Sequence, residues 1–361
     1  MTDLLEFNDP QLASKLITVI RNKARSLDRV RIMEVCGTHT MEIGRLGLRS
    51  LLPENVQLIS GPGCPVCVTP GSYIDTAVAC ARDHKATLLT YGDMVRVPGN
   101  ATSLEKARAE GADVQVVTSA LQAVETARNS KNEVVFLAVG FETTTPPTAA
   151  AVLAAHQKNI PNVSFLVSHR VIPPALRVLA EDKELAISAF MLPGHVSAII
   201  GEVAYKVLGD YRVPGVITGF EPLDIMLGIS EALDMLQSDT PEVRNAYPRV
   251  VKKEGNPAAR AMIDKVFKAD DIEWRGIGVL PATGLAIRDE YAGFDAMAKF
   301  GLTLGESTMP EGCACGEVLK GKVGPGECPL FATTCTPENP VGPCMVSSEG
   351  SCAAYYKYER R

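Results

Sequence analysis

Residues 133–168 have the sequence EVVFLAVGFETTTPPTAAAVLAAHQKNIPNVSFLVS. Its two ends, EVVFLAVG (133–140) and VSFLVS (163–168), are apolar throughout, and a helical pattern at 148–157 lies between them. Strands that are apolar at every position, separated by a helix, are typical of βαβ units, because parallel sheets are covered by helices on both faces. This stretch therefore predicts an α/β fold with parallel strands.

The same alternation extends in both directions along the chain. Further apolar runs occur at 29–35, 56–60, 86–91, 113–117, 185–192 and 215–220, with amphipathic stretches at 72–84, 119–129 and 196–208. About eight strands exceed what one small sheet needs, and we expect two sheets, with a helix at 120–131 leading from the first into the second. The predicted organisation is two parallel-sheet α/β domains, 1–130 and 131–300, followed by a small Cys-rich domain, 301–361, that is mostly irregular or helical.

Composition narrows the class of protein. The chain has 361 residues, of which 46% are apolar and 22% charged, and its net charge is -6. No long Lys/Arg run is present, so nucleic-acid binding is not expected, and no apolar stretch is long enough to span a membrane. The amino terminus has no pattern of a signal peptide. Ten cysteines without an export signal favour the cytoplasm, where Cys clusters usually bind metal or take part in catalysis.

Six of the ten cysteines lie in the last 49 residues, in a segment rich in Gly and Pro. A segment so poor in large apolar side chains buries little surface, so a metal or covalent bonds must organise it. The paired C-x(2–4)-C knuckles of zinc sites are missing from this segment, whereas an iron–sulfur cluster accepts thiolates from irregular loops. An iron–sulfur cluster is therefore the favoured interpretation, with zinc and disulfides or free thiols as alternatives.

The second sulfur-bearing element is GPGCPVC at 61–67, which follows a predicted strand. Its Cys64 and Cys67 can form a redox disulfide, bind a metal through two sulfurs, or be buried thiols in a tight loop. Two thiolates leave a tetrahedral metal incomplete, and Cys36, at the end of another predicted strand, is the candidate for a third ligand. Cys80 lies on the apolar side of a predicted helix and is assigned to the core.

Together these motifs resemble the HypD family of [NiFe]-hydrogenase maturation proteins. The resemblance begins near residue 30 and extends to the carboxyl end, and several long motifs in fixed order are more specific than any single C-x-x-C. The motifs that carry it are CGTH (36–39), GPGCPVCVTP (61–70), GFETTTP (140–146), PGHVS (193–197), GFEPLD (219–224), ECPLFATTCTP (327–337) and GPCMVSSEG (342–350).

The resemblance implies a scaffold on which the iron of the hydrogenase active site receives its cyanide and carbonyl ligands, as Fe(CN)2CO. Cys36, Cys64 and Cys67 would hold the iron or activate its incoming ligands. A [4Fe-4S] cluster would supply electrons, with Cys313, Cys328, Cys335 and Cys352 as its ligands and Cys315 and Cys344 as a redox dithiol. The implied partners are a HypC-type chaperone that helps to hold the iron and a HypE-type donor of the cyano group, with the chain a monomer within heteromeric complexes.

Four further side chains have open roles. His39 can donate a hydrogen bond or a proton to a bound ligand, or stabilise its own loop. Glu142 and Glu221 can orient sulfur or a partner, or cap helices, and His195 is expected at a helix start. Two other functions remain open: an iron–sulfur-dependent thiol–disulfide oxidoreductase that uses Cys64 and Cys67, and an iron metallochaperone without a redox step.

Overall fold

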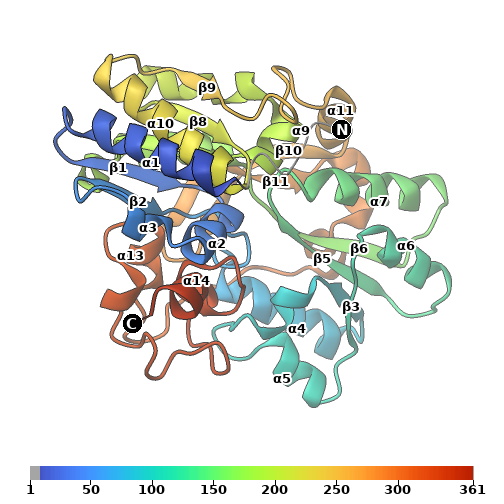
Figure 1. Ribbon diagram of the computed structural model, residues 1–361. Helices are drawn as coiled ribbons and strands as arrows, with labels where there is room; N and C mark the ends of the chain where they lie inside the picture. Colours follow the sequence, from blue (N-terminus) through green and yellow to red (C-terminus); the bar gives the residue numbers. More distant parts are fainter. Residues whose placement is uncertain (1–8, 361) are drawn as a thin grey trace.

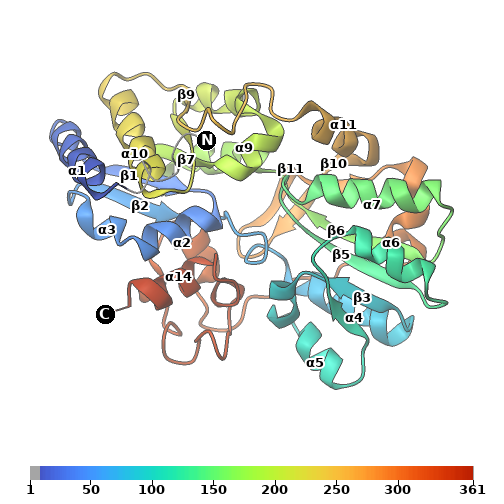
Figure 2. The ribbon, with the colours of Figure 1, turned by 45° about the vertical axis from the view of Figure 1, so that its right-hand side comes forward.

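The computed structural model describes residues 9–360, and its fold is α/β with two parallel sheets, as predicted. The first sheet has the strand order β2-β1-β7-β8-β9 and the second has the order β4-β3-β5-β6. Figures 1 and 2 show the two sheets side by side, with the carboxyl-terminal region lying against both units. Within the described residues, no helix is long and apolar enough to cross a membrane.

The strands of the first sheet are all parallel and alternate their side chains between two cores. On β1, Ile32 packs on one face of the sheet and Met33 on the other. The Ile32 face is covered by two long helices, and the Met33 face belongs to a central core that also contains cysteines. The elements of this unit are α1 (Pro10–Ala24), β1 (Val30–Glu34), α2 (Gly37–Arg45), α3 (Leu48–Leu51), β2 (Val56–Ser60), β7 (Ala189–Pro193), α9 (Gly194–Ile200), a 3-10 helix (Glu202–Tyr211), β8 (Gly215–Thr218), α10 (Pro222–Gln237) and β9 (Val243–Asn245).

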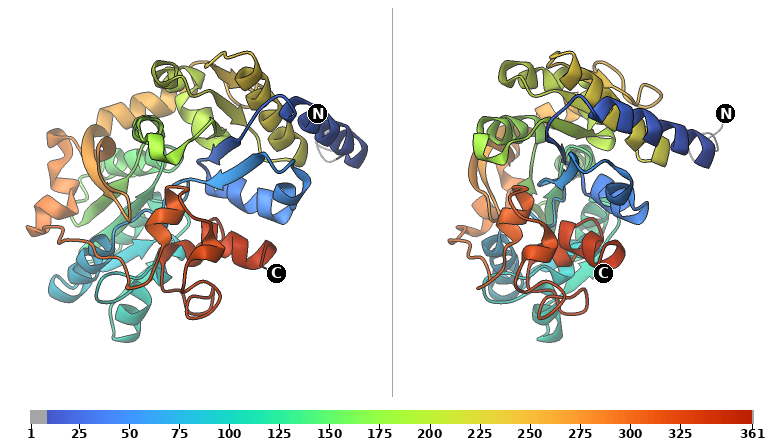
Figure 3. Two further views of the ribbon diagram at one scale, coloured as in Figure 1. Left: turned by 90° about the vertical axis from the view of Figure 1, so that its left-hand side faces the viewer. Right: turned by 60° about the vertical axis from the view of Figure 1, so that its left-hand side comes forward.

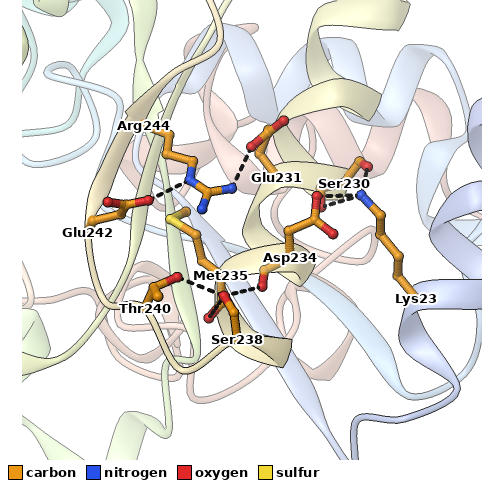
Figure 4. A network of polar contacts seen from close by, with 9 residues as sticks. All are labelled: Lys23, Ser230, Glu231, Asp234, Met235, Ser238, Thr240, Glu242 and Arg244. Carbon is orange, nitrogen blue, oxygen red and sulfur yellow. Dashed lines mark hydrogen bonds and ion pairs between the residues drawn. The ribbon is translucent and has the colours of Figure 1, made fainter.

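Polar contacts fix the outer helices and the β9 edge of this sheet (Figure 4). The Lys23 ammonium of α1 bonds to the Asp234 carboxylate of α10 at 2.6 Å and to the Ser230 hydroxyl at 2.7 Å. Arg244 of β9 bonds to Glu231 of α10 at 2.8 Å. These contacts complement the apolar packing of α1 against α10 and link that helix layer to the edge strand.

The second sheet is covered by helices on both faces. Phe136 and Phe165 pack under α6 and α7, whereas Leu137 and Leu166 pack toward α4 and α5. Cys80 is fully buried in this second core, as predicted. The elements are α4 (Gly71–Asp83), β3 (Thr87–Thr90), a 3-10 helix (Gly92–Arg96), α5 (Leu104–Ala109), β4 (Val114–Val116), α6 (Leu121–Arg128), β5 (Val134–Gly140), α7 (Thr145–Gln157), β6 (Val163–His169) and α8 (Ile172–Glu181).

Sheet membership differs from the predicted division at residue 130. The strands before residue 130 belong to both sheets, because β1 and β2 pair with β7–β9 while β3 and β4 pair with β5 and β6. The helix expected to lead from one sheet into the other, α6, instead joins two strands of the same sheet, so that prediction is wrong. The chain crosses between the sheets twice, once through 61–70 and α4 and once through α8.

Two elements complete the chain. An antiparallel hairpin, β10 (Phe267–Trp274) and β11 (Gly278–Ile287), was not predicted; it follows α11 (Pro257–Val266) and adjoins β6 through a bridge between Arg170 and Gly284. After a 3-10 helix (Asp289–Phe294) and α12 (Ala296–Phe300), the region 301–360 is mostly irregular, as expected, with α13 (Cys315–Leu319), two short 3-10 turns and α14 (Ser351–Tyr358). Figure 3 shows this region between the two units.

Candidate metal centre

A cleft of about 440 Å³ lies where the carboxyl ends of strands from both sheets face each other. Ligands of α/β proteins bind at this edge because loops rather than side-chain layers cover it. The first sheet contributes the loops after β1, β2 and β7, and the second contributes the loop after β5. The residues that line the cleft include Cys36, Thr38, Gly63, Pro65, Phe141, Thr144, His195 and Glu349.

Cys36 is the sulfur in this cleft. It follows β1 and precedes the first turn of α2, and only 8% of its surface is exposed. Burial raises the pKa of its thiol to about 11, and the Glu349 carboxylate acts in the same direction, while the N–H groups of Thr38 and His39 lower it. At neutral pH the free thiol is therefore protonated, and a bound metal ion would displace that proton.

The Gly61–Cys67 loop packs directly on the Cys36 backbone. The N–H of Gly37 donates to the carbonyl of Gly63 at 3.0 Å. A Cβ atom on Gly63 would lie 2.1 Å from the amide nitrogen of Cys36, so only glycine permits this approach. The glycine at position 63 therefore allows the backbones of the Cys36 segment and the Gly61–Cys67 loop to pack against each other.

Cys64 and Cys67 belong to the central core rather than to the lining of the cleft. Only 3% of the surface of Cys64 is exposed and Cys67 is fully buried. The N–H of Cys67 lies 3.4 Å from the sulfur of Cys64, and the Cys64 and Cys344 thiols both influence the pKa of Cys67. Burial raises the pKa of Cys67 well above its ordinary value.

All six carboxyl-terminal cysteines surround one small cavity. Among these cysteines, Cys344 interacts with the thiols of Cys315 and Cys352, and it also interacts with Cys67 of the 61–67 loop. The pKa values of Cys344 and Cys315 are raised well above normal by neighbouring thiols and, to a smaller extent, by burial. The cavity is lined by Cys313, Cys315, Cys328, Cys335, Cys344 and Cys352, together with Phe331, Gly342 and Met345.

The environment of this cavity suits an iron–sulfur cluster. Backbone N–H groups already point at two of its sulfurs: Ala314 donates to Cys328 at 3.4 Å and Val341 to Cys335 at 3.3 Å. A Cβ on Gly342 would lie 2.7 Å from the sulfur of Cys313, so the wall must be glycine there. Soft thiolates, nearby amide donors and small residues are the surroundings that such clusters use.

The cysteine sulfurs of this structure are not arranged as a preformed site for a single metal ion. Across residues 9–360, no three His, Cys, Asp or Glu side chains are already positioned to hold one metal ion. Cys36, Cys64 and Cys67 are therefore neighbours by their backbones, but their sulfurs do not converge. All ten cysteines are free thiols in this structure.

His195 lies at the start of α9, as expected, and lines the cleft, whereas His39 does not. His39 is fully buried; its Nε2 lies 2.9 Å from both the Gly219 carbonyl and the Thr218 hydroxyl, and burial lowers its pKa to about 4. Its ring stacks on the ring of Phe220, with 4.6 Å between centroids. The ring of His195 also stacks on Phe220, with 4.0 Å between centroids. The imidazole that lines the cleft with Cys36 is His195.

Glu349 is a cleft residue that sequence reasoning missed. Its carboxylate accepts a hydrogen bond from the Thr38 hydroxyl at 2.7 Å, and its Cβ is so close to Gly37 that no side chain fits there. The carboxyl-terminal region therefore supplies an acid to the site built by the first sheet. The sequence feature that could have identified Glu349 is its position within the motif GPCMVSSEG.

The two strand-end glutamates have different surroundings. Glu142 is buried and accepts a hydrogen bond from the N–H of Ile172 at 2.7 Å, so it caps α8 across the cleft edge, and burial raises its pKa to about 7. The N–H of Glu221 donates to Asp224 at 3.3 Å at the start of α10. Both positions agree with roles at helix N-termini.

The fold and site define a class: a two-sheet α/β protein with a thiol-bearing cleft beside a six-cysteine cavity. The model of the HypD family, described as the hydrogenase formation hypA family, matches residues 11–359, and the chain belongs to this family.

Curated relatives agree over nearly the whole chain. The chain is 45% identical to the hydrogenase maturation factor HypD of Cupriavidus necator, covering 98% of this chain and 96% of the relative. It is 43% identical to the HypD of Escherichia coli K12, with 99% and 98% covered. A putative hydrogenase expression/formation protein of Methanocaldococcus jannaschii is 42% identical, with 99% and 100% covered.

Proposed function

We propose that this chain is a hydrogenase maturation factor that acts as the scaffold for assembly of Fe(CN)2CO. The observation that carries the proposal is the placement of Cys36. It is a buried thiol in a cleft between two sheets, on a backbone locked to the Cys64–Cys67 loop, whose Cys67 contacts the carboxyl-terminal cysteines. This arrangement connects the proposed iron-binding cleft at Cys36, through the Cys64–Cys67 loop, to the carboxyl-terminal cysteines.

The iron is the substrate of this scaffold. Cys36 would bind it first, because its sulfur is the one that lines the cleft, and Cys64 and Cys67 would join through a change of the Gly61–Cys67 loop. Low-spin iron with cyanide and carbonyl ligands is a soft centre that suits thiolates. His195 and Glu349 lie on the same cleft and would contact ligands on the iron. His39, neutral and held by Gly219, would orient Phe220 and through it His195.

The carboxyl-terminal cavity would hold a [4Fe-4S] cluster through Cys313, Cys328, Cys335 and Cys352. A bound cluster supplies electrons one at a time. Cys344 and Cys315 would form the redox dithiol between that cavity and Cys67, because Cys344 contacts both Cys315 and Cys67. Buried thiols in contact can exchange a disulfide without a diffusing carrier.

The expected partners follow the same scheme. A HypC-type chaperone would help to hold the iron at the cleft, and a HypE-type protein would deliver the cyano group to it. The chain would be the single scaffold subunit of such heteromeric complexes, working in the cytoplasm, where its thiols stay reduced.

Two other functions are less consistent with the geometry. A general thiol–disulfide oxidoreductase needs an accessible attacking sulfur, but Cys64 and Cys67 are buried. A metallochaperone without redox chemistry needs no contact between Cys67 and Cys344. Disulfide turnover that depends on Cys64 would favour the first of these alternatives.

Infrared spectroscopy tests the proposal. The chain is purified anaerobically in complex with its chaperone, and cyanide and carbonyl stretching bands are expected. They should vanish in Cys36→Ala and persist in Cys80→Ala, a matched loss of a buried thiol in a core distant from the cleft. A properly iron-loaded complex without these bands would contradict the scaffold.

A second measurement tests the cluster separately. Iron and acid-labile sulfide should be present after anaerobic purification of the chain alone, and both should fall in Cys335→Ala. Contents near zero in the unmodified chain would refute the cluster while leaving the Cys36 site open to test.

A further inference from the structure

Arg275 is a buried guanidinium that no role proposed above uses. It follows β10 at the turn of the hairpin, and only 1% of its surface is exposed. Its N–H donates to the carbonyl of Val68 at 2.9 Å, and its Nη1 donates to the carbonyl of Pro98 at 2.6 Å. The backbone of Arg275 is therefore hydrogen-bonded to Val68, the residue that follows Cys67 in the Cys64–Cys67 loop.

Part of this guanidinium lacks a partner. Among the residues that the structure describes, Nε and Nη2 of Arg275 find no hydrogen-bond acceptor. A buried cation without a full set of partners is costly, so such groups usually serve a nearby anion. Burial lowers the pKa of Arg275, and the neighbouring groups that act in the opposite direction are Cys315, Cys313 and Cys344, followed by Asp75. Three of these four belong to the carboxyl-terminal cavity.

The hairpin turn is fixed to the helix that carries one of those cysteines. Gly276 has a φ of +73°, and a Cβ there would lie 2.6 Å from the Cα of Gly316, next to Cys315. Conversely, a Cβ on Gly316 would lie 2.5 Å from the carbonyl oxygen of Gly276. The close approach of these two glycines places the segment that carries Arg275 directly against the start of the helix that carries Cys315.

Arg170 has different surroundings, although its Nε, like that of Arg275, has no hydrogen-bond acceptor among the described residues. Arg170 is also fully buried, but its Nη atoms donate to Ser168 and to the Glu273 carbonyl, and its ring contact is Trp274. No cysteine contributes to its electrostatic surroundings. Arg170 is therefore a structural cation of the second unit and provides a matched control.

We propose that Arg275 is a positioning residue of the six-cysteine cavity, whose fixed positive charge favours the reduced, more negative state of the cluster held there. This inference rests on the cluster proposed above. One-electron reduction adds one negative charge to the cluster and breaks no bond, so a nearby cation raises the reduction potential. An arginine guanidinium stays charged at neutral pH.

Three variants separate charge from packing. Arg275→Gln keeps a donor for the Pro98 carbonyl but removes the charge, and Arg275→Lys keeps the charge. Arg275→Met, an apolar side chain of similar length, makes the same comparison if the Gln variant does not fold. Arg170→Gln removes a buried charge away from the cysteines.

The measurement is an equilibrium redox titration of the full chain with dithionite as the electron donor, followed by electron paramagnetic resonance. In Arg275→Gln, the ratio of reduced to oxidised cluster at a fixed potential should fall about tenfold, which is 59 mV for a one-electron couple. Arg275→Lys should stay within about threefold of the unmodified chain, a shift of less than half that size. Arg170→Gln should leave the ratio unchanged even where it lowers thermal stability.

The outcomes distinguish this inference from the function beneath it. Full iron and sulfide content with an unchanged potential in Arg275→Gln, or equal shifts in the Gln and Lys variants, would overturn the role of Arg275 and leave the cluster standing. An unmodified chain that holds no iron or sulfide would overturn the cluster and this inference with it.

Discussion

The thiols of Cys67 and Cys344 are close enough to shift each other's pKa, although the two residues are far apart in the chain and lie on different elements. Cys67 also lies 4.0 Å from the carbonyl of Pro343, which precedes Cys344. The loop that links the two sheets and the carboxyl-terminal region therefore meet through thiols. Electrons or a disulfide can therefore pass between Cys67 and the carboxyl-terminal cysteines.

Mild oxidation of the anaerobically purified chain should join Cys67 to Cys344. The added oxidant takes two electrons and two protons from the pair as the S–S bond forms, and this is favoured between thiols that are neighbours. Mass spectrometry of peptides under non-reducing conditions should find this link, and Cys344→Ser should abolish it. Cys80, buried in another core, should remain unlinked. Disulfides confined to the carboxyl-terminal cysteines would contradict the contact.

The glycine in the wall of the six-cysteine cavity provides a second prediction. In Gly342→Ala the new methyl group would meet the Cys313 sulfur at 2.7 Å, and overpacking of this kind costs about 1–3 kcal/mol. We expect a large loss of bound iron and sulfide. Gly326→Ala, in the same region with open space around it, should keep both at the level of the unmodified chain. Equal contents in the two variants would show that the cavity wall is not tight.

Much of the fold was predictable because its strands are buried on both faces. Each of the eight apolar runs contains a strand, although the run at 185–192 begins too early, since Ala186 has a φ of +47° and the strand starts only at Ala189. The pairing of strands was not predictable, because an apolar run carries no information about its neighbour in a sheet. The hairpin β10–β11 was missed because nearly half of its strand residues are exposed and it lacks a continuous apolar run.

The site was predictable to the extent that it depends on strand ends. Cys36 and the Gly61–Cys67 loop adjoin because they follow neighbouring parallel strands, β1 and β2. The contributions of Glu349 and Arg275 depend instead on how the carboxyl-terminal region and the hairpin dock, which no local pattern encodes. The burial of His39 was equally hidden, since its partners, Thr218 and Gly219, lie at the carboxyl end of β8.

A buried ion-pair network fastens α14, which carries Cys352, to the first sheet. Arg49 bonds to the fully buried Glu34 and to Glu359 at the end of α14, each at 2.5 Å. Arg49→Met leaves the Glu34 carboxylate buried without its cation, and we expect a loss of about 3–5 kcal/mol in the free energy of unfolding. Arg45→Met removes an exposed pair with Glu42 and should cost less than about 1 kcal/mol. Urea denaturation measures both, and similar losses would contradict the network.

The pH dependence of stability should depend on Glu142. Burial raises the pKa of this carboxyl to about 7, compared with an ordinary value of 4.5, so the folded state holds its proton more tightly than the unfolded state does. The stabilisation is complete below pH 4.5 and is lost as the pH rises through 7, at about 3 kcal/mol in total. Glu142→Gln keeps an acceptor for the Ile172 N–H and should flatten the decline in unfolding free energy between pH 5 and 8. Glu125→Gln, at an exposed position of α6, should leave that decline unchanged. Denaturant titrations at a series of pH values measure the slopes, and a decline that persists in full in Glu142→Gln would assign it to another group.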